Sequence, residues 1–597
     1  MVPSSVYAAS TFRLAHSYDR ILDACRRQGI SRIAMCTSVT GKIIGSLKDI
    51  ARWRDRLRSD GLEVFALIYG LGHPFMGKHY DAAGQPPEPT PFYDGPHEMT
   101  EQTPADLLLP RGWQYAVNDF GQPVFCNACP NPAAVAGNVR AVQETAALFD
   151  EVWYDDDYRN DGDQMAGAPH TSSAACYCDA CVEVLSRRVG RKVSRADVLA
   201  DQALHEQWVN MKTDKLADMW AAICQAAREV NPNVRMGLMI RWGGEERDGL
   251  DLAKLLPHMD GSNLLRAGEG HFGAKEYRRW PSPVVEYLSV TYHVGWFPQS
   301  ARVLSETTYF HETPPDSVRK KVLLALAAGA GEVSYCPCVH GWIEDQNFLE
   351  HDLPKINQAA ELFADKTAMH RPIAMLRGPK AAAGDRRPIQ RVRDRQLFPL
   401  LGMAGLCSAV VRKGSWRDHD QYDVLAVTSR AVWDFDLSEL GERQLVLDGL
   451  ALLEDAPLIG QLGISTVDRH DGGRVSFSGE GFVADGLLMT RGPVVVIPYV
   501  WQDVPDEDLP TLLADIRRVL GPRVSSAVAE GDVLVMPVHY RSGDRDALML
   551  VNLDHQPRTV TVRLPDDRAR LFDPAGGAVE PRITLQADEV RLLVSKA

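Results

Sequence analysis

The sequence predicts an α/β protein whose first part is a (β/α)8 TIM barrel. Two observations favour this class: short β-rich runs alternate with amphipathic stretches over about 370 residues, and eight such pairs fit within that length. An open doubly wound sheet is the alternative. It usually has fewer strands and a glycine-rich phosphate turn after the first one, and no G-x-G-x-x-G motif follows the first strand here.

The elements of the predicted barrel follow in order along the chain. The strands are Val6–Phe12, Arg32–Thr37, Val64–Tyr69, Val152–Asp156, Val234–Ile240, Leu264–Ala267, Arg302–Glu306 and Glu332–Cys336. Apolar residues at helical spacing predict helices over Ser17–Arg27, Leu47–Ser59, Ala133–Phe149, Leu204–Val230, Leu250–His258, Asp316–Ala328 and Pro354–Ala364. The loop between the third and fourth strands, residues 70–131, is long and rich in aromatic residues, which is typical of a functional loop.

The barrel pattern ends around Ala368–Pro372, and two further sections follow. A second α/β section contains Ile373–Leu376, Leu397–Leu406, Tyr422–Val427, Glu439–Leu452 and Val494–Ile497. From about Gly531 the apolar residues alternate with a period of two, in Val533–Val538, Ala547–Asn552, Thr559–Leu564 and Val590–Val594. We therefore predict a barrel over residues 1–370, an α/β domain over 371–530 and a small antiparallel β-sandwich domain over 531–597.

Composition and charge narrow the class of partner. The 597 residues are 45% hydrophobic and 24% charged, as in an ordinary globular protein, and carry a net charge of −14. This charge argues against nucleic acid or an anionic membrane as a partner. No apolar stretch approaches the roughly 18 residues of a membrane span, and the N-terminus lacks a signal-peptide pattern. We expect a cytoplasmic protein.

The most informative feature is the acidic run Asp155-Asp156-Asp157, which ends the fourth predicted strand. Three adjacent like charges repel one another, so a fold places them together only where something offsets that cost. An acidic cluster at the carboxyl end of a barrel strand is typical of a catalytic site. The alternative is a solvated loop or a helix cap, which the preceding Trp153-Tyr154 makes less attractive.

A second cluster holds three cysteines within six residues, Cys176-Tyr177-Cys178-Asp179-Ala180-Cys181. Either Cys126 or Cys129 upstream can supply a fourth thiolate. Four thiolates form a closed tetrahedral zinc site, which is structural rather than catalytic. Free buried cysteines are the alternative. No organic cofactor is expected.

Four motifs and one further run resemble those of glycoside hydrolase family 42, the β-galactosidases of a large clan of retaining TIM-barrel enzymes. Cys129-Pro-Asn-Pro is similar to the family segment that supplies one zinc ligand, and Cys176–Cys181 to its zinc triplet. Trp153–Tyr158 resembles its fourth-strand motif, and Leu304-Ser-Glu-Thr307 its seventh-strand nucleophile motif. The run 327–335, with Trp342 beyond it, resembles its eighth-strand approach.

The resemblance carries expectations for the whole chain. It implies a barrel, a flavodoxin-like α/β domain associated with trimer formation and a small β domain, hence a homo-oligomer, either trimer or dimer. It also implies that Cys129 rather than Cys126 completes the zinc site. The family has Asn-Glu where this chain has Asp156-Asp157. This difference shortens one side chain and adds a negative charge at the other position, so the galactoside specificity of the family does not transfer directly.

The resemblance also assigns catalytic roles. Glu306 is the expected nucleophile, and Asp157 is the expected general acid and then base. Repulsion from Asp155 and Asp156 would raise the pKa of Asp157, which suits an acid. Two carboxyl groups about 5–5.5 Å apart retain the anomeric configuration, and about 6.5–9.5 Å apart invert it. Because the Asp side chain is shorter than that of Glu, it widens the distance between the two carboxyl groups towards the inverting range.

Further candidates for binding the substrate lie at predicted strand ends. Sugar sites combine aromatic faces with polar side chains that bind hydroxyl groups. The candidates, with Asp155 and Asp156, are His73, Arg241, Trp242, Arg266, Glu269, His271 and Trp342. Arg241-Trp242 is the strongest pair among them, because a cation facing three aspartates also balances charge.

The sequence therefore favours a retaining exo-glycosidase for a galactoside or an arabinoside, furanosides included, in short oligosaccharides. One alternative is a metal-dependent hydrolase that uses Asp155, Asp157, His170 and His271. No H-x-H or H-E-x-x-H spacing supports it. The other alternative is a non-catalytic sugar-binding protein on the same barrel.

Overall fold

The structure is a computed structural model. It describes residues 4–9, 11–72, 109–155, 175–241, 249–259, 264–268, 287, 290, 291, 302–308, 315–336, 348–365, 370, 372–377, 397–406, 409–413, 422–428, 437–542, 545–565, 570–587 and 589–596.

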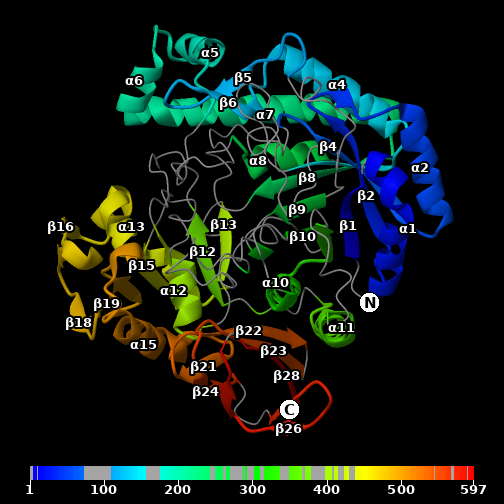
Figure 1. The fold of residues 1–597 in the computed structure, drawn as a ribbon. Helices are drawn as coiled ribbons and strands as arrows, with labels where there is room; N and C mark the ends of the chain where they lie inside the picture. The colour runs from blue at the N-terminus through cyan, green and yellow to red at the C-terminus, as the bar shows by residue number, and fades with distance from the viewer. Residues whose placement is uncertain are drawn as a thin grey trace.

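Eight parallel strands form a closed ring in the first part of the chain, and several of them are labelled in Figure 1. They are β1 (Ser4–Ala9), β2 (Arg32–Val39), β4 (Glu63–Tyr69), β7 (Glu151–Tyr154), β8 (Arg235–Arg241), β9 (Leu264–Gly268), β10 (Arg302–Thr308) and β11 (Glu332–Cys336). Each strand pairs with the next one in the chain, and β1 pairs with both β11 and β2, which closes the ring. The predicted TIM barrel is therefore confirmed, with all eight predicted strands in place.

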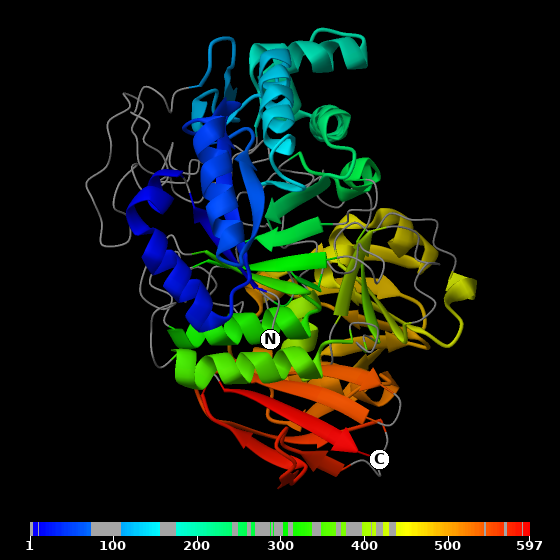
Figure 2. The ribbon, with the colours of Figure 1, turned by 90° about the vertical axis from the view of Figure 1, so that its right-hand side faces the viewer.

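Helices surround this ring, as Figure 2 shows for the first two. The described helices of the barrel region are α1 (Thr11–Gln28), α2 (Leu47–Ser59), α4 (Pro132–Ala146), α5 (Asp179–Val189), α6 (Arg195–Ala200), α7 (Gln202–Val230), α8 (Leu252–Leu255), α10 (Pro315–Ala327) and α11 (Leu353–Leu362). Local capping explains several of their starts. The side chains of Ser46, Asn131 and Asp201 accept hydrogen bonds from backbone N–H groups in the first turns of α2, α4 and α7.

The first predicted strand extends too far. We predicted Val6–Phe12, whereas β1 ends at Ala9 and α1 already begins at Thr11. Buried Leu14, Tyr18 and Leu22 of α1 lie four residues apart, so the helical pattern starts before the predicted Ser17. A short apolar run is compatible with either a strand or the first turn of a helix, and its length alone does not separate the two.

Side chains of the barrel strands alternate between the helices and the interior, as the period of two requires. Val64, Ala66 and Ile68 of β4 belong to the large core that the surrounding helices share. Phe65 and Leu67, one position along, pack inside the ring with other residues of its interior, which are Ala34, Cys36, Tyr69, Trp153 and Leu264. The interior of the barrel is therefore filled by side chains from several strands.

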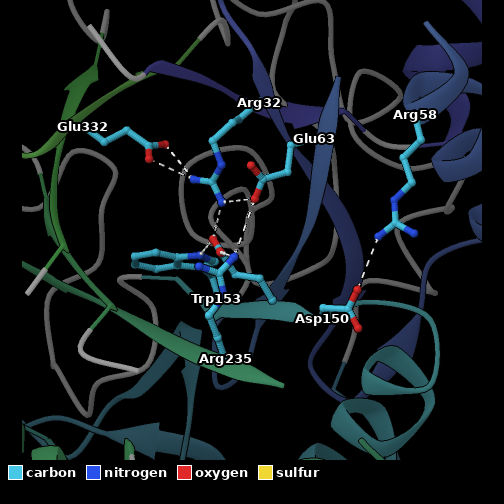
Figure 3. A network of polar contacts seen from close by, with 8 residues as sticks. Arg32, Arg58, Glu63, Asp150, Trp153, Arg235 and Glu332 are labelled. Atoms are coloured by element: carbon cyan, nitrogen blue, oxygen red, sulfur yellow. Dashed lines mark hydrogen bonds and ion pairs between the residues drawn. The ribbon is translucent and has the colours of Figure 1, made fainter. Parts of the chain in front are cut away.

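A network of charges lies at the amino-terminal end of the ring, with Arg32, Glu151 and Glu332 buried at its centre (Figure 3). The Arg32 guanidinium donates to both carboxylate oxygens of Glu332, at 2.8 and 2.9 Å, and to Glu151 at 2.6 Å and Glu63 at 3.0 Å. Arg235 pairs with the second oxygen of Glu151 at 2.6 Å. These residues begin β2, β11, β7, β4 and β8, so the network joins five strands at their first positions.

A second, mixed sheet follows the barrel, with strand order β13-β12-β14-β15-β20-β19-β18. The strands β12 (Ile373–Arg377), β13 (Ala409–Lys413), β14 (Val424–Val427), β15 (Gln444–Asp448) and β20 (Val494–Ile497) are parallel. β18 (Val483–Asp485) and β19 (Leu488–Arg491) extend it in antiparallel pairing. The accompanying helices are α12 (Leu397–Met403), α13 (Gly449–Glu454), α14 (Ala456–Gln461) and α15 (Leu509–Leu520). A separate hairpin joins β16 (Ile464–Arg469) and β17 (Val475–Gly479).

Two antiparallel sheets form the last part of the chain. One has the order β21-β24-β27 and the other β22-β23-β28-β25-β26. Their strands are β21 (Val528–Gly531), β22 (Val535–Ser542), β23 (Arg545–Asn552), β24 (Arg558–Arg563), β25 (Arg570–Phe572), β26 (Ala578–Val579), β27 (Arg582–Leu585) and β28 (Val590–Lys596). Residues of both sheets share one core cluster. Tyr540 of β22 donates to the Ala327 carbonyl of the barrel helix α10 at 2.8 Å, which ties this part to the barrel.

His370 lies where these last two parts meet. Its Nε2 lies 2.6 Å from the Ser525 carbonyl oxygen, and its backbone N–H donates to the carbonyl of His539 at 2.9 Å. Burial, followed by the nearby His539, lowers the pKa of His370 below its ordinary value of 6.5, although the Ser525 hydrogen bond and Asp423 act in the opposite direction. The folded protein therefore holds His370 as neutral imidazole to a lower pH than the unfolded chain does.

This difference between the pKa of His370 in the folded and unfolded states predicts a loss of stability in mild acid. Below a pH of about 6.5 the unfolded state binds a proton that the folded state does not, so the free energy of unfolding falls as the pH decreases. Because His370→Gln removes the titrating group, the variant should lose less stability than the parent between pH 7 and pH 5. Urea unfolding midpoints across this range measure the difference. Equal pH slopes in the two proteins would contradict the prediction.

Candidate active site and metal centre

The fourth strand of the barrel ends in a buried carboxylate. Asp155 directly follows β7, and its backbone N–H donates to the carbonyl of Ile68 at 3.1 Å, which continues the pairing with β4. Only 2% of Asp155 is exposed. Glu151 and Trp153, at alternate positions before it, lie in the barrel interior. Asp155 thus continues the interior-facing positions at the carboxyl end, where enzymes of this fold hold their active sites.

The conformation of β7 beneath Asp155 is set by tight packing. The indole Nε1 of Trp153 donates to Glu151 at 2.7 Å, which links the interior to the charge network below it. The Trp153 ring lies against Gly237 of β8 so closely that a Cβ there would be 2.3 Å from ring atoms. Tyr154 faces the other way and meets Trp220 of α7 edge-on, with ring centroids 5.6 Å apart.

Glu306 occupies the carboxyl-terminal half of β10, the seventh strand of the barrel. Its backbone is in register with Ser334 of β11, and Ser305 is in register with Ala267 of β9. In the ring, β8 and β9 separate β10 from β7 on one side, and β11, β1, β2 and β4 on the other. The strands that carry Glu306 and Asp155 therefore stand across the barrel from each other.

Arg241 is the last residue of β8, in register with Gly268, the last residue of β9. Its backbone therefore lies at the same carboxyl-terminal rim. Arg266 is the third residue of β9, where its backbone is in register with Leu304 of β10 and Met239 of β8. The remaining residues that the sequence nominates for the site lie outside the described residues, and these are His73, Asp156, Asp157, His170, Trp242, Glu269, His271 and Trp342.

Four thiols meet at the predicted metal centre. The Sγ atoms of Cys129, Cys176, Cys178 and Cys181 all lie within 4.8 Å of one another. The Sγ of Cys129 is 3.6 Å from that of Cys181 and 3.7 Å from that of Cys178. A tetrahedral ion with bonds of about 2.3 Å to sulfur needs its sulfur atoms about 3.8 Å apart. The four residues are 0–9% exposed. Donor type, spacing and burial thus fit a metal ion held by four thiolates.

Contacts among the thiols shift their pKa values in opposite directions. Hydrogen bonding with Cys129 lowers the pKa of the Cys178 thiol. Hydrogen bonding to Cys129 and burial raise the pKa of the Cys176 thiol. The buried thiols thus share protons through sulfur–sulfur contacts. Because the thiolate is the form that binds metal, a divalent ion would replace these protons.

A hairpin that the sequence analysis missed brings Cys129 to the other three cysteines. It consists of β5 (Tyr115–Val117) and β6 (Pro123–Ala128), within the loop expected over residues 70–131. Cys129 follows β6 and donates its N–H to the Gln114 carbonyl at 2.8 Å, while the Tyr177 N–H donates to Val117 at 2.8 Å. The turn residues Asn118 and Gly121 between two apolar runs were the signal that could have indicated it.

The long helix α7 packs against this centre. Trp208 stacks on Tyr177, with ring centroids 4.3 Å apart, and its Nε1 donates to the Cys176 carbonyl at 3.4 Å. Lys215, half-buried two turns further on, places its Nζ 3.4 Å from the Cys129 Sγ and 3.2 Å from the Cys181 Sγ. Sequence reasoning missed both residues because neither belongs to the cysteine motif.

Lys215 stays a cation in this environment. Burial lowers its pKa, but the negative charges of Cys181 and Cys129 and the hydrogen bonds to them outweigh burial, so the pKa of Lys215 lies above its ordinary value.

Within the described ranges, no helix is long and apolar enough to cross a membrane.

Comparisons with known proteins found a match in structure but not in sequence. No protein-family model and no curated protein sequence matches the chain. A cold-adapted β-galactosidase from Rahnella sp. R3 aligns with a TM-score of 0.62 at 12% identity, covering 100% of this chain and 98% of that one. A β-galactosidase from Halorubrum lacusprofundi gives 0.63 at 13%, covering 100% and 99%.

Other structures with this fold are described as members of glycoside hydrolase family 42. An exo-carrageenase of that family from Bacteroides ovatus aligns with a TM-score of 0.53 at 10% identity, covering 100% of this chain and 80% of that one. A β-galactosidase of the family from G. stearothermophilus aligns with a TM-score of 0.62 at 11% identity, covering 100% and 98%. Over its full length, this chain therefore has the fold of the family 42 glycoside hydrolases.

Proposed function

We propose that this protein is a glycoside hydrolase that removes a terminal sugar from short oligosaccharides with retention of configuration. The proposal rests on acidic residues of two barrel strands, the fourth and the seventh, towards their carboxyl-terminal ends. The fourth strand ends in the buried Asp155, followed in sequence by two more aspartates, and the seventh strand carries Glu306. The fold is that of family 42 glycoside hydrolases over the whole chain.

In this proposal Glu306 attacks the anomeric carbon and forms a glycosyl–enzyme bond. Asp157 donates a proton to the departing glycosidic oxygen, and then accepts a proton from the water that cleaves the intermediate. Atoms balance over the two steps: the leaving group gains the proton that the water later returns. Repulsion from the neighbouring Asp155 and Asp156 helps Asp157 to keep its proton before the first step.

The proposed substrate is a galactoside or an arabinoside, arabinofuranosides included. Asp156 and Asp157 stand where the related motif has Asn-Glu, which changes the contacts available to the sugar hydroxyl next to the anomeric carbon. The proposed binding residues are Asp155, Asp156, His73, Arg241, Trp242, Glu269, His271 and Trp342. One structural neighbour acts on carrageenan, so the same fold accommodates more than one substrate class.

The four cysteines are proposed to hold a structural zinc ion. Cys129, Cys176, Cys178 and Cys181 use all four positions of a tetrahedral ion and leave none for a substrate, as in structural zinc sites. The ion, when bound, would cross-link the hairpin β5–β6 to the start of α5. We also propose that the protein assembles as a trimer or a dimer, as the motif resemblance implies.

Hydrolysis of synthetic glycosides tests the proposal. A panel of nitrophenyl α- and β-galactopyranosides, arabinopyranosides and arabinofuranosides, with carrageenan oligosaccharides, should contain at least one substrate. That activity should disappear in Asp157→Asn and in Glu306→Gln. It should persist in Asp150→Asn, which removes an exposed carboxylate at the opposite end of the same strand.

Two results would count against parts of the proposal. Unchanged turnover in both variants would refute the assigned residues. NMR spectra of the first-formed sugar would show the retained anomer if the covalent intermediate exists, and the inverted anomer would refute the role of Glu306 as nucleophile while leaving the hydrolase class intact.

A further inference from the structure

We infer that Lys215 is the outer-sphere cation of the four-cysteine centre, and that it slows metal loss and protects Cys129 and Cys181 from electrophiles. This inference rests on the proposed metal site. It assigns a role to a residue of α7 that lies outside the cysteine motif, 86 residues from Cys129 and 34 from Cys181 in the chain.

The sulfur atoms of the cluster receive hydrogen bonds from different kinds of donor. Cys176 accepts from two backbone amides, the N–H groups of Val117 at 3.3 Å and Cys178 at 3.4 Å. Cys129 and Cys181 instead accept from the Lys215 ammonium. Backbone amides thus donate to Cys176, whereas one side-chain ammonium donates to both Cys129 and Cys181.

A metal-loaded centre would carry excess negative charge. Four thiolates around a divalent ion carry a net charge of −2, and this charge lies in a cluster whose residues are at most 9% exposed. A buried charge needs compensation from a nearby opposite charge. Lys215 lies within hydrogen-bonding distance of two of the four sulfur atoms and halves the net charge of the centre.

Lys215 also links the two chain segments that carry the cysteines. Three of the cysteines, Cys176, Cys178 and Cys181, lie at or before the start of α5, and Cys129 follows β6. Lys215 contacts one sulfur from each segment, so it bridges the two loops on the side facing α7. Groups that hydrogen-bond to metal ligands orient them, and their removal typically costs about 10- to 100-fold in metal affinity.

Metal release tests the inference without using catalysis. Wild-type protein prepared with zinc should carry a stoichiometric amount, measured by elemental analysis. Transfer of that zinc to the chromogenic chelator 4-(2-pyridylazo)resorcinol should be about 10-fold faster in Lys215→Met. Lys215→Arg keeps the positive charge and should fall between the two. Lys254→Met is the matched control, because Lys254 contacts Thr213 and Asp214 of the same helix instead of the sulfur atoms.

Alkylation provides a second readout. In the zinc-loaded proteins, iodoacetamide should modify Cys129 and Cys181 faster in Lys215→Met than in the wild type, because the metal-bound thiolates lose the hydrogen bonds that reduce their nucleophilicity, as mass spectrometry of the peptides would show. Cys176, which keeps its two amide donors, should change little.

Two outcomes would overturn the inference. One is equal zinc transfer rates in the wild type, Lys215→Met and Lys254→Met. The other is wild-type protein that carries and accepts no zinc, which would refute the metal site itself. A protein that binds zinc in this manner but cleaves no glycoside would leave the inference standing and count only against the proposed enzyme.

Discussion

Replacing Glu306 with glycine is expected to abolish turnover of the best glycoside in the panel, with a fall in kcat of at least about 10³-fold, equivalent to about 4 kcal/mol of transition-state stabilisation. The reason is that the proposed covalent step loses its nucleophile. Added azide should restore product formation, because the small anion can enter the space left by the side chain and attack the anomeric carbon. The product would then be a glycosyl azide formed by a single displacement, with inverted configuration.

The same reagent separates the two proposed roles. In Asp157→Gly, Glu306 still forms the glycosyl–enzyme bond, and azide then attacks that intermediate. Two displacements give a glycosyl azide with retained configuration. Proton NMR of the two azide products provides the measurement. Opposite anomers would support the assignment, whereas identical anomers from both variants would refute it. Asp150→Gly controls for the loss of an exposed carboxylate just before β7.

Replacing Arg32 with methionine is expected to destabilise the barrel by about 3–5 kcal/mol, the usual cost of removing one partner from a buried ion pair. Arg32 is 2% exposed and holds Glu332, which is fully buried, and Glu151, which is 3% exposed. Burial acts to lower the pKa of Arg32, but the carboxylates of Glu332 and Glu151 outweigh it and raise that pKa, so the guanidinium is charged in the fold. Without it, two buried carboxylates lose their principal counter-charge.

The control is the surface pair visible in the same view (Figure 3). Arg58 lies 3.9 Å from Asp150, with 41% and 76% of the two side chains exposed. Arg58→Met should therefore cost no more than about 1 kcal/mol. Urea midpoints followed by tryptophan fluorescence give the comparison. Adding Glu332→Gln to Arg32→Met should recover part of the loss, because it removes a stranded charge. Equal midpoints for Arg32→Met and Arg58→Met would contradict the prediction.

The elements that the sequence predicted well are those whose signal is local. Runs such as Val64–Tyr69 and Glu332–Cys336 combine apolar and β-branched residues over strand length, and both are strands. The helix over Leu47–Ser59 was predicted with its observed bounds, because Ser46 caps it and its buried residues Ile50, Trp53 and Leu57 recur at helical spacing. The boundary of β1 was wrong because Phe12 suits a strand and a helix equally.

The cysteine cluster was predictable for a related reason. Three of its members lie within six residues, and that density is visible in the sequence. The hairpin β5–β6 and Lys215 were not predicted. The hairpin lies within a long loop whose turn residues gave only a weak signal, and Lys215 is one of many lysines on helices until the fold brings it to the sulfur atoms.

By itself the sequence determined the alternation of strands and helices in the barrel and the three clustered cysteines of the metal centre. These properties depend on residues that are close in the chain. The tertiary structure alone decided that β1 closes the ring against β2 and β11, that Arg32 pairs with Glu332 300 residues away, and that Lys215 faces the thiols. Such contacts form only when distant segments meet, and the free energy that selects them comes from burial and charge pairing in the folded chain, which local sequence patterns do not encode.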